Sequence, residues 1–163
     1  PDVKVKVLWT NTWYNPASEK QAALTLLDAG ADVIVQHQDT PGPQQAAEER
    51  GKFGIGYNVD MSGAAPKAEL TSAVWNWGPY YASAIQQIID GKWKSGAYWG
   101  SMKDKVVDIA PYGPAVSEDT KKITDAPIKD QTGNVKVAEG QTMSDEDLLK
   151  FDWFVEGVEG TIK

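Results

Sequence analysis

The chain has 163 residues, no cysteine and a formal net charge of −7. That length fits one domain but is short for a protein of two lobes. The acidic charge argues against nucleic acid as a partner, because proteins that bind its backbone usually carry a basic patch. Without cysteine there is no disulfide, thiolate nucleophile or cysteine-bound zinc. The sequence has no run of about 18 apolar residues that could span a membrane. Its start at Pro1, without a signal peptide, predicts a trimmed or partial polypeptide.

The first 60 residues predict a β-α-β-α-β unit. Valine and lysine alternate over Val3–Val7, which is the period of a strand with one wet face, and we expect this strand to reach Trp9. The apolar run 31–35 is typical of a strand covered on both faces. The other expected elements are a helix from Asn15-Pro16 to Gly30, a helix over 43–50 that ends at Gly51, and a strand over 53–57. Right-handed crossovers place such helices on the faces of the sheet, so we expect a doubly wound, parallel α/β fold.

The rest of the chain is less regular. Residues 70–77 predict an extended segment, and Gly78-Pro79 opens a helix with an apolar face that ends at Gly91. Residues 129–137, around Thr132-Gly133-Asn134, resemble a β-hairpin. Ser144 and Asp147 form a weak capping box ahead of Leu148 and Leu149. The acidic run 145–147 suits a helix start better than a metal site.

Each of the first three predicted strands runs into a polar turn. The turns are Asn11–Tyr14, Gln36–Thr40 and Tyr57–Asp60. If the strands are parallel, all three turns open on one edge of the sheet, and open α/β sheets bind ligands at the carboxyl edge. A small-molecule site is therefore the first hypothesis. The candidate ligand-binding residues in these turns are Trp13, Tyr14, Gln36, Asp39 and Asp60.

Two of these candidates also have structural explanations. The indole of Trp13 could stack on a flat ligand or could cover the top of the core. The carboxylate of Asp60 could accept hydrogen bonds from vicinal hydroxyls or an amino group. It could equally cap a turn with Ser62. Both alternatives stay open from the residues alone.

Catalysis, phosphate binding and metal binding have less support. His37 is the only histidine, and beside Asp39 it could act as a general base. Asp39, with Thr40 and Pro41, could equally cap the following helix. The sequence has no nucleophile motif and no second histidine for a metal, and the glycines at 51, 54 and 56 surround a strand instead of forming a phosphate loop. We expect no catalytic residue, metal or cofactor.

Five blocks occur in order along the chain, followed by a patterned tail. The blocks are Thr10–Ala17, Gly30–Ile34, Gln44–Glu48, Gly56–Asp60 and Leu70–Val74, and the tail comprises Ala126–Gly133, Gly140, Ser144-Asp145 and Trp153–Val158. With these blocks the chain resembles the basic membrane protein family. This family consists of substrate-binding proteins of ABC importers and includes purine nucleoside receptors. The match corresponds to the C-terminal half of a family member.

The resemblance implies a type I periplasmic-binding-protein fold, a three-layer αβα architecture in which two lobes close on a ligand. Here the fold would be incomplete and would lack most of the first lobe. Residues 1–69 would form the α/β domain of the second lobe, 70–99 the hinge crossing and the segment returning from the first lobe, and 100–163 the second crossing and the C-terminal tail. The helix after Gly78 would lack its usual cover, which predicts exposed hydrophobic surface.

The resemblance also implies roles for three residues. Trp13 matches the aromatic residue that stacks on the purine, and Asp60 matches the acidic residue that meets the sugar. Trp75 departs from the family pattern Leu-Thr-Ser-x-x-Lys, whose lysine reaches ribose. Our hypothesis is therefore a free nucleobase such as adenine, or another small flat heterocycle, with Trp13 and Trp75 as apolar walls and Asp60 as the polar anchor.

We therefore expect the substrate-binding protein of an ABC importer, which binds a purine nucleobase or nucleoside without turnover. Its partners would be the ligand, an ABC permease and the missing first lobe, and it would be periplasmic or a membrane-anchored extracytoplasmic lipoprotein. Two alternatives remain. One is a doubly wound nucleoside hydrolase or transferase that uses His37 and Asp39, and the other is a ligand sensor of the same fold coupled to signalling.

Overall fold

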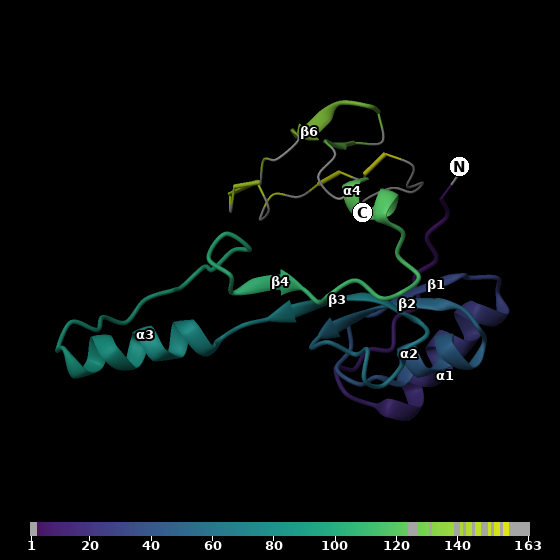
Figure 1. The fold of residues 1–163 in the computed structure, drawn as a ribbon, viewed down its shortest axis with the longest axis horizontal. Coiled ribbons are helices and arrows are strands. Elements are labelled where there is room, and N and C mark those ends of the chain that lie inside the picture. Colours follow the sequence, from purple (N-terminus) through teal and green to yellow (C-terminus); the bar gives the residue numbers. More distant parts are fainter. Residues whose placement is uncertain are drawn as a thin grey trace. The chain divides into compact units, whose positions relative to one another are not determined.

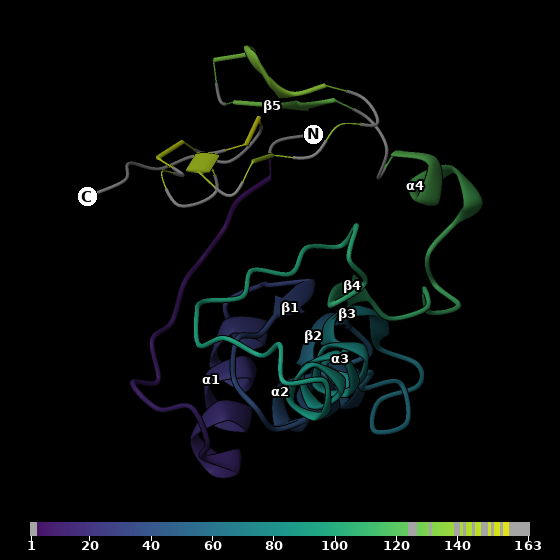
Figure 2. The ribbon, with the colours of Figure 1, turned by 90° about the vertical axis from the view of Figure 1, so that its left-hand side faces the viewer.

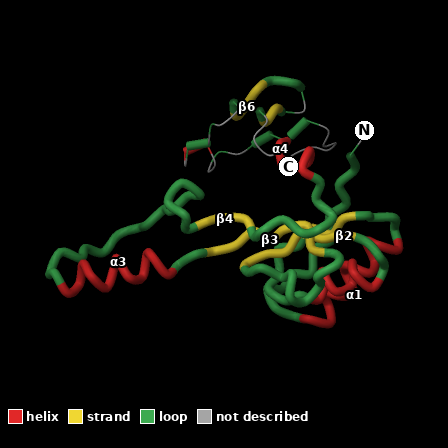
Figure 3. The backbone as a smooth tube through the Cα atoms, viewed as in Figure 1, coloured by secondary structure: helices red, strands yellow, loops and turns green. Residues whose placement is uncertain are grey.

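The computed structural model describes residues 3–123, 127–130, 132–138, 141, 143–144, 146–147, 150, 152–153 and 155–156. The chain forms two compact units, one of residues 8–115 and one of residues 1–7 and 116–163. The larger unit holds a four-stranded sheet and the smaller a two-stranded one (Figure 3). None of the helices in the described ranges has the length and apolar character that a membrane crossing needs. The expected division at residues 69 and 99 stays a prediction.

The sheet of the larger unit is mainly parallel. Strands β1 (Val33–Val35), β2 (Phe53–Asn58) and β3 (Glu69–Trp75) run parallel in that order, and β4 (Val107–Ile109) pairs antiparallel with β3. Helices α1 (Pro16–Asp28) and α2 (Gly42–Glu49) lie on the same side of this sheet (Figures 1 and 2). The predicted α/β fold with a parallel sheet is confirmed.

The boundaries of α1 follow the sequence signals. The side chain of Asn15 accepts a hydrogen bond from the backbone N–H of Ser18 (3.1 Å), and Pro16 occupies the first helical position. Gly30 has φ +96°, a left-handed conformation that glycine adopts without strain and that ends helices. The expected helix is confirmed.

Apolar side chains, most of them small, and buried amides fill the space between the helices and the sheet. The apolar core consists of Ala23, Leu27, Ile34, Ala46, Ala47, Ala65 and Ala68. Gln44 of α2 is fully buried, and its Nε2 donates to Oε1 of Gln36 (2.8 Å) and to the carbonyl of Ile55 (3.0 Å). A Cβ at Gly54 would lie 2.8 Å from Cδ of Gln44. A side chain at position 54 would therefore force the buried amide of Gln44 to move.

At β1, the face of the sheet opposite the helices is exposed within the described residues of this unit. Of the three residues of β1 only Ile34 is buried, whereas Val33 is 38% and Val35 is 70% exposed. The prediction that this strand is covered on both faces is therefore wrong. α1 and α2 lie on one face, so the described residues of this unit supply two of the three expected layers (Figure 1).

The predicted first strand is also wrong. Val3 forms a single bridge, residues 4–10 have no regular structure, and Val7 and Trp9 are 67% and 81% exposed. Alternating valines make a segment able to enter a sheet, but a strand forms only where a neighbour completes its hydrogen-bond ladder. Within the described residues, β1 at this end of the sheet pairs with β2 and with no second named strand.

Helix α3 (Gly78–Ile89) forms as predicted but is not packed. Gly91 ends it with φ +66°. None of its residues is buried, and its apolar side chains Tyr81, Ile85, Ile88 and Ile89 are between 57% and 72% exposed. The exposed hydrophobic surface expected for this helix is present in the structure.

The smaller unit contains the predicted hairpin. Strands β5 (Ile128–Lys129) and β6 (Val135–Val137) pair antiparallel, and the unit also holds helix α4 (Glu118–Ile123). The carboxylate of Asp130 accepts hydrogen bonds from Thr132 and Asn134 in the turn, and these bonds hold its pKa well below the usual range. Ser144 accepts the backbone N–H of Asp147 (3.2 Å), as the capping box predicts. The rest of that motif and much of the tail, namely residues 126, 131, 140, 145, 148–149, 154 and 157–158, lie outside the described residues.

Candidate ligand-binding site

Four aromatic rings form a row along the carboxyl edge of the sheet. The ring centroids of Trp13 and His37 are 5.6 Å apart, those of His37 and Tyr57 4.4 Å, and those of Tyr57 and Trp75 5.9 Å. The backbone carbonyl of Trp13 accepts from the N–H of Asp39 (3.1 Å), which holds this loop at the edge. Trp13 and Trp75, the two walls expected from the sequence, are thus the two ends of one continuous row.

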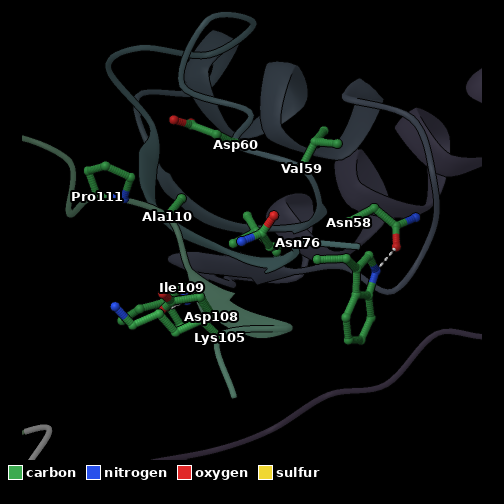
Figure 4. Close-up of a pocket in the computed structure, with 11 residues that line it drawn as sticks. Asn58, Val59, Asp60, Asn76, Lys105, Asp108, Ile109, Ala110 and Pro111 are labelled. Carbon is green, nitrogen blue, oxygen red and sulfur yellow. Dashed lines mark hydrogen bonds between the residues drawn. The ribbon is translucent and has the colours of Figure 1, made fainter. Parts of the chain in front are cut away.

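A hollow of about 440 Å³ opens at the Trp75 end of the row. Its lining residues are Asn58, Val59, Asp60, Val74, Trp75, Asn76, Lys105, Asp108, Ile109, Ala110 and Pro111. Figure 4 shows Asp60 on one side of the hollow and the side chains of Lys105 and Asp108 on the other. The volume falls in the range of small-molecule sites. The hollow combines apolar walls with charges of both signs.

Asp60 has both of the features that the sequence left open. Its Oδ1 accepts the backbone N–H of Ser62 (2.9 Å), which is the turn cap. Hydrogen bonds from the Ser62 side chain and backbone lower the pKa of Asp60, so the carboxylate is ionised at neutral pH. The residue is nevertheless exposed and lines the hollow. The cap therefore orients a charged group that a ligand can reach.

Gln36 lies beneath the edge. It is 6% exposed, and its Nε2 donates to the carbonyls of Gln38 (2.8 Å) and Thr40 (2.8 Å). Together with the bond from Gln44, these contacts fix the loop after β1. The structure therefore places Gln36 as a support for the loop and does not bring it to the surface with the other candidates.

Asp39 and Tyr14 line a second hollow of about 260 Å³ on the same unit. Oδ1 of Asp39 accepts from Nδ2 of Asn58 (2.6 Å). Of the expected cap on the next helix by Asp39 with Thr40 and Pro41, the structure shows only the contribution of Thr40. The hydroxyl of Thr40 accepts the N–H of Gly42 at that position (3.3 Å), while the N-cap residue Pro41 makes no such bond.

His37 is placed for packing. Its ring lies between those of Trp13 and Tyr57. His37 and Asp39 both belong to the described part, and no hydrogen bond joins them there. Within the described ranges no group of three or more histidine, cysteine, aspartate or glutamate residues could hold a metal ion.

Three further residues contribute to this edge and were not among the predicted ligand-binding residues. Tyr57 continues the aromatic row, Asn58 bonds both Asp39 and Trp75, and Lys105 lines the larger hollow. The first two stand at the end of a predicted strand and could have been found from that position. Lys105 comes from a turn far along the chain, where its φ is +57°, and no motif connects it to the edge.

Residues 1–141 match the model of a protein family described as ABC transporter substrate-binding protein, PnrA-like. This chain belongs to that family. Substrate-binding proteins of ABC transporters act outside the cytoplasm, and they bind small molecules in partnership with a permease. The resemblance expected from the sequence is confirmed.

Individual relatives in the family carry different descriptions. The chain is 36% identical to a purine-binding protein of Brucella abortus (strain 2308), over 98% of this chain and 49% of that protein. It is 35% identical to a putative ABC transporter glucose-binding protein of Haloferax volcanii, over 99% of this chain and 43% of that protein. The chain thus spans about half the length of these relatives.

A solved structure supports the fold. An ABC transporter solute-binding protein from Conexibacter woesei DSM 14684 superimposes with a TM-score of 0.57 at 27% identity, covering 73% of this chain and 41% of that one. Both the sequence and the structural matches therefore describe a family fold of which this chain carries a part.

Proposed function

We propose that this PnrA-like chain forms half of a binding protein that takes a purine nucleobase such as adenine, or a purine nucleoside, without turnover. The observation that carries this proposal is the row of aromatic rings that ends at a hollow containing the ionised Asp60. Aromatic faces favour flat rings, and a carboxylate accepts hydrogen bonds from amino or hydroxyl groups. The purine-binding relative in Brucella abortus supports the same ligand class.

The choice between base and nucleoside depends on the polar end of the hollow. The bulk of Trp75 favours a free base. Lys105, however, supplies a cation to the same hollow, so the charge missing at position 75 is available from another segment. Replacement of Lys105 by alanine separates the two ligands: adenosine binding should weaken and adenine binding should not, if the ammonium meets the sugar side.

The complete binding protein, by which we mean this chain with its proposed first lobe, would close around the ligand. A ligand that contacts both lobes shifts the equilibrium to the closed state, and this step needs no covalent chemistry. We propose an ABC permease as the partner that receives the closed form. We also propose that the complete binding protein is either periplasmic or anchored outside the cytoplasm as a lipoprotein.

Isothermal titration of the complete binding protein with adenine, adenosine, guanosine and glucose tests this function. We expect a purine to bind, with adenine ahead of the two nucleosides. Preference for the nucleosides would contradict the argument from Trp75. Glucose is included because the Haloferax relative is described as a glucose-binding protein. Binding of glucose and of no purine would contradict the purine proposal. Chromatography of the same samples should show intact nucleosides, since released base would indicate a hydrolase.

A further inference from the structure

Asn58 joins three chain segments at the edge that carries the aromatic row. It is the last residue of β2. Its Oδ1 accepts from Nε1 of Trp75 at the end of β3 (2.5 Å), and its Nδ2 donates to Oδ1 of Asp39 in the loop after β1 (2.6 Å). Figure 4 shows the first of these bonds as the dashed line that ends on Asn58. A single carboxamide therefore links an indole to a carboxylate.

The chemistry of the two partners permits only one arrangement of this amide. An indole N–H is a donor only, and a carboxylate is an acceptor only, so the amide oxygen must face Trp75 and the amide nitrogen must face Asp39. The backbone at Asn58 has φ +71°, a left-handed conformation that asparagine adopts more readily than most residues. Asparagine thus satisfies the backbone and both neighbours at once.

These bonds decide what the hollow offers to a ligand. The N–H of Trp75 is already used, so Trp75 presents its ring and no hydrogen-bond donor. That ring stands at 85° to the ring of Tyr57. One oxygen of Asp39 is used as well, and the exposed carboxylates that line the larger hollow are those of Asp60 and Asp108.

We propose that Asn58 is a positioning residue of the binding edge. By holding the indole of Trp75 it turns this side of the hollow into an apolar wall for a flat ring, with Asp60 as the polar anchor. This inference rests on the proposed function, because it assigns Asn58 a role in the affinity for a flat ligand. It adds a specificity element that lies between the two hollows.

Four variants of the complete binding protein test the role. Asn58→Gly keeps the left-handed backbone and removes both bonds. Asn58→Asp places a carboxylate against that of Asp39. The double variant Asp39→Asn with Asn58→Asp exchanges the two groups, so that the carboxylate at position 58 accepts from both Trp75 and the amide at position 39. Gln21→Glu, on the exposed side of α1, controls for the added charge.

Two measurements are made on each variant. Titration calorimetry gives the affinity for adenine, and the indole N–H resonance of Trp75, assigned with Trp75→Phe, reports the orientation of the ring without any ligand. We expect adenine affinity to fall at least tenfold in Asn58→Asp and several-fold in Asn58→Gly. Affinity should return to within about threefold of wild type in the exchanged double variant and stay unchanged in Gln21→Glu. The Trp75 resonance should shift in Asn58→Asp and Asn58→Gly, return toward its wild-type position in the double variant and stay unchanged in Gln21→Glu.

The outcomes separate this inference from the proposed function. If Asn58→Gly shifts the Trp75 resonance but binds adenine as tightly as wild type, the positioning role is overturned although a purine binds. If no purine binds to wild type, the proposed function fails, and the resonance alone decides whether Asn58 sets the indole: displacement in Asn58→Gly with return in the double variant supports it, and an unmoved resonance refutes it.

Discussion

Helices α1 and α3 have similar local sequence signals and opposite fates. Both carry proline in the first turn, and both are followed by a glycine in a left-handed conformation, Gly30 and Gly91. Yet α1 buries Ala23 and Leu27, whereas none of the residues of α3 is buried. The signals at the ends of a helix thus fix where it forms, and a neighbouring element decides whether its apolar face is covered. We propose that the first lobe of the complete binding protein covers α3.

The largest expected effect contrasts one leucine with one isoleucine. Leu27 of α1 is 8% exposed and Ile88 of α3 is 61% exposed. In the 163-residue chain, Leu27→Ala should lower the free energy of unfolding by about 2–5 kcal/mol, because it leaves a cavity. Ile88→Ala should change it by less than about 0.5 kcal/mol, as surface substitutions do. Urea unfolding measures both values.

The same pair in the complete binding protein sharpens the comparison. If the first lobe covers α3, Ile88→Ala should lower the free energy of unfolding of the complete protein by an amount closer to that expected for a buried side chain such as Leu27. An equally small cost in both proteins would show that α3 stays exposed and would contradict the proposed cover. A small cost of Leu27→Ala in the 163-residue chain would contradict the core described between α1, α2 and the sheet.

A pair of glycines tests packing by addition of one methyl group. A Cβ at Gly54 would lie 2.8 Å from Cδ of Gln44, whereas a Cβ at Gly78, at the start of α3, would come no closer than 3.7 Å to Asn76. Gly54→Ala should therefore cost about 1–3 kcal/mol through overpacking. Gly78→Ala should be neutral or slightly stabilising, because it reduces the entropy of the unfolded chain. Equal thermal stability of the two variants would mean that Gln44 of α2 is not packed tightly against Gly54 of β2.

The buried carboxyl group of Glu69, in β3 of the packed region, should make the stability of the chain depend on pH. Burial raises the pKa of Glu69, which is 1% exposed, above its ordinary value of 4.5, although its bond from the Ser72 hydroxyl acts in the opposite direction. The folded chain therefore holds this proton more tightly than the unfolded chain does. The stabilisation is complete below about pH 4.5 and is lost as the pH rises through the folded-state pKa.

Glu69→Gln should remove this dependence, since glutamine stays neutral. Wild type should lose stability above pH 4.5 with a slope of at most about 1.4 kcal/mol per pH unit for one proton. The variant should lack that slope and should unfold at a higher urea concentration at pH 8. Parallel pH profiles for the two proteins would show that Glu69 has the same pKa in the folded and the unfolded states.

Local signals predicted most elements of this fold. The caps at Asn15 and Gly30, the apolar run that became β1, and the turn at Gly133 each gave an element close to its observed place. The first strand at Val3–Val7 was predicted from its alternation and did not form, since pairing depends on a neighbour that alternation does not reveal. Short-range patterns therefore predict where a helix or strand begins and ends, but they do not predict which other element it packs or pairs with.

The site was predictable to a similar extent. Parallel strand order indicates that the turns after β1 and β2 meet at one edge. Trp13 was expected there from a first strand that does not form, and Trp75 was expected there only from the family resemblance, yet the structure brings both into the same row of rings. The contribution of Lys105 depends on where β4 returns beside β3, a long-range pairing. The burial of Gln36 depends on Gln44, whose amide reaches it across the core. Neither could be derived from spacing in the sequence.

The smallest expected effect compares two tryptophans that are exposed to the same extent. Trp13 at the edge and Trp99 in the segment after α3 are each 65% exposed. Trp13→Ala should weaken adenine binding to the complete binding protein, because a stacked aromatic contact is lost. The binding free energy should fall by about 0.5–1.5 kcal/mol more than the loss of buried apolar surface alone would cost. Trp99→Ala should leave the affinity unchanged. Calorimetric titrations of both variants, with the ligand-induced change in tryptophan fluorescence, measure the difference. Because exposure is matched in the 163-residue chain, a loss confined to Trp13 would come from its place at the edge beside His37, and equal losses would remove the stacking argument.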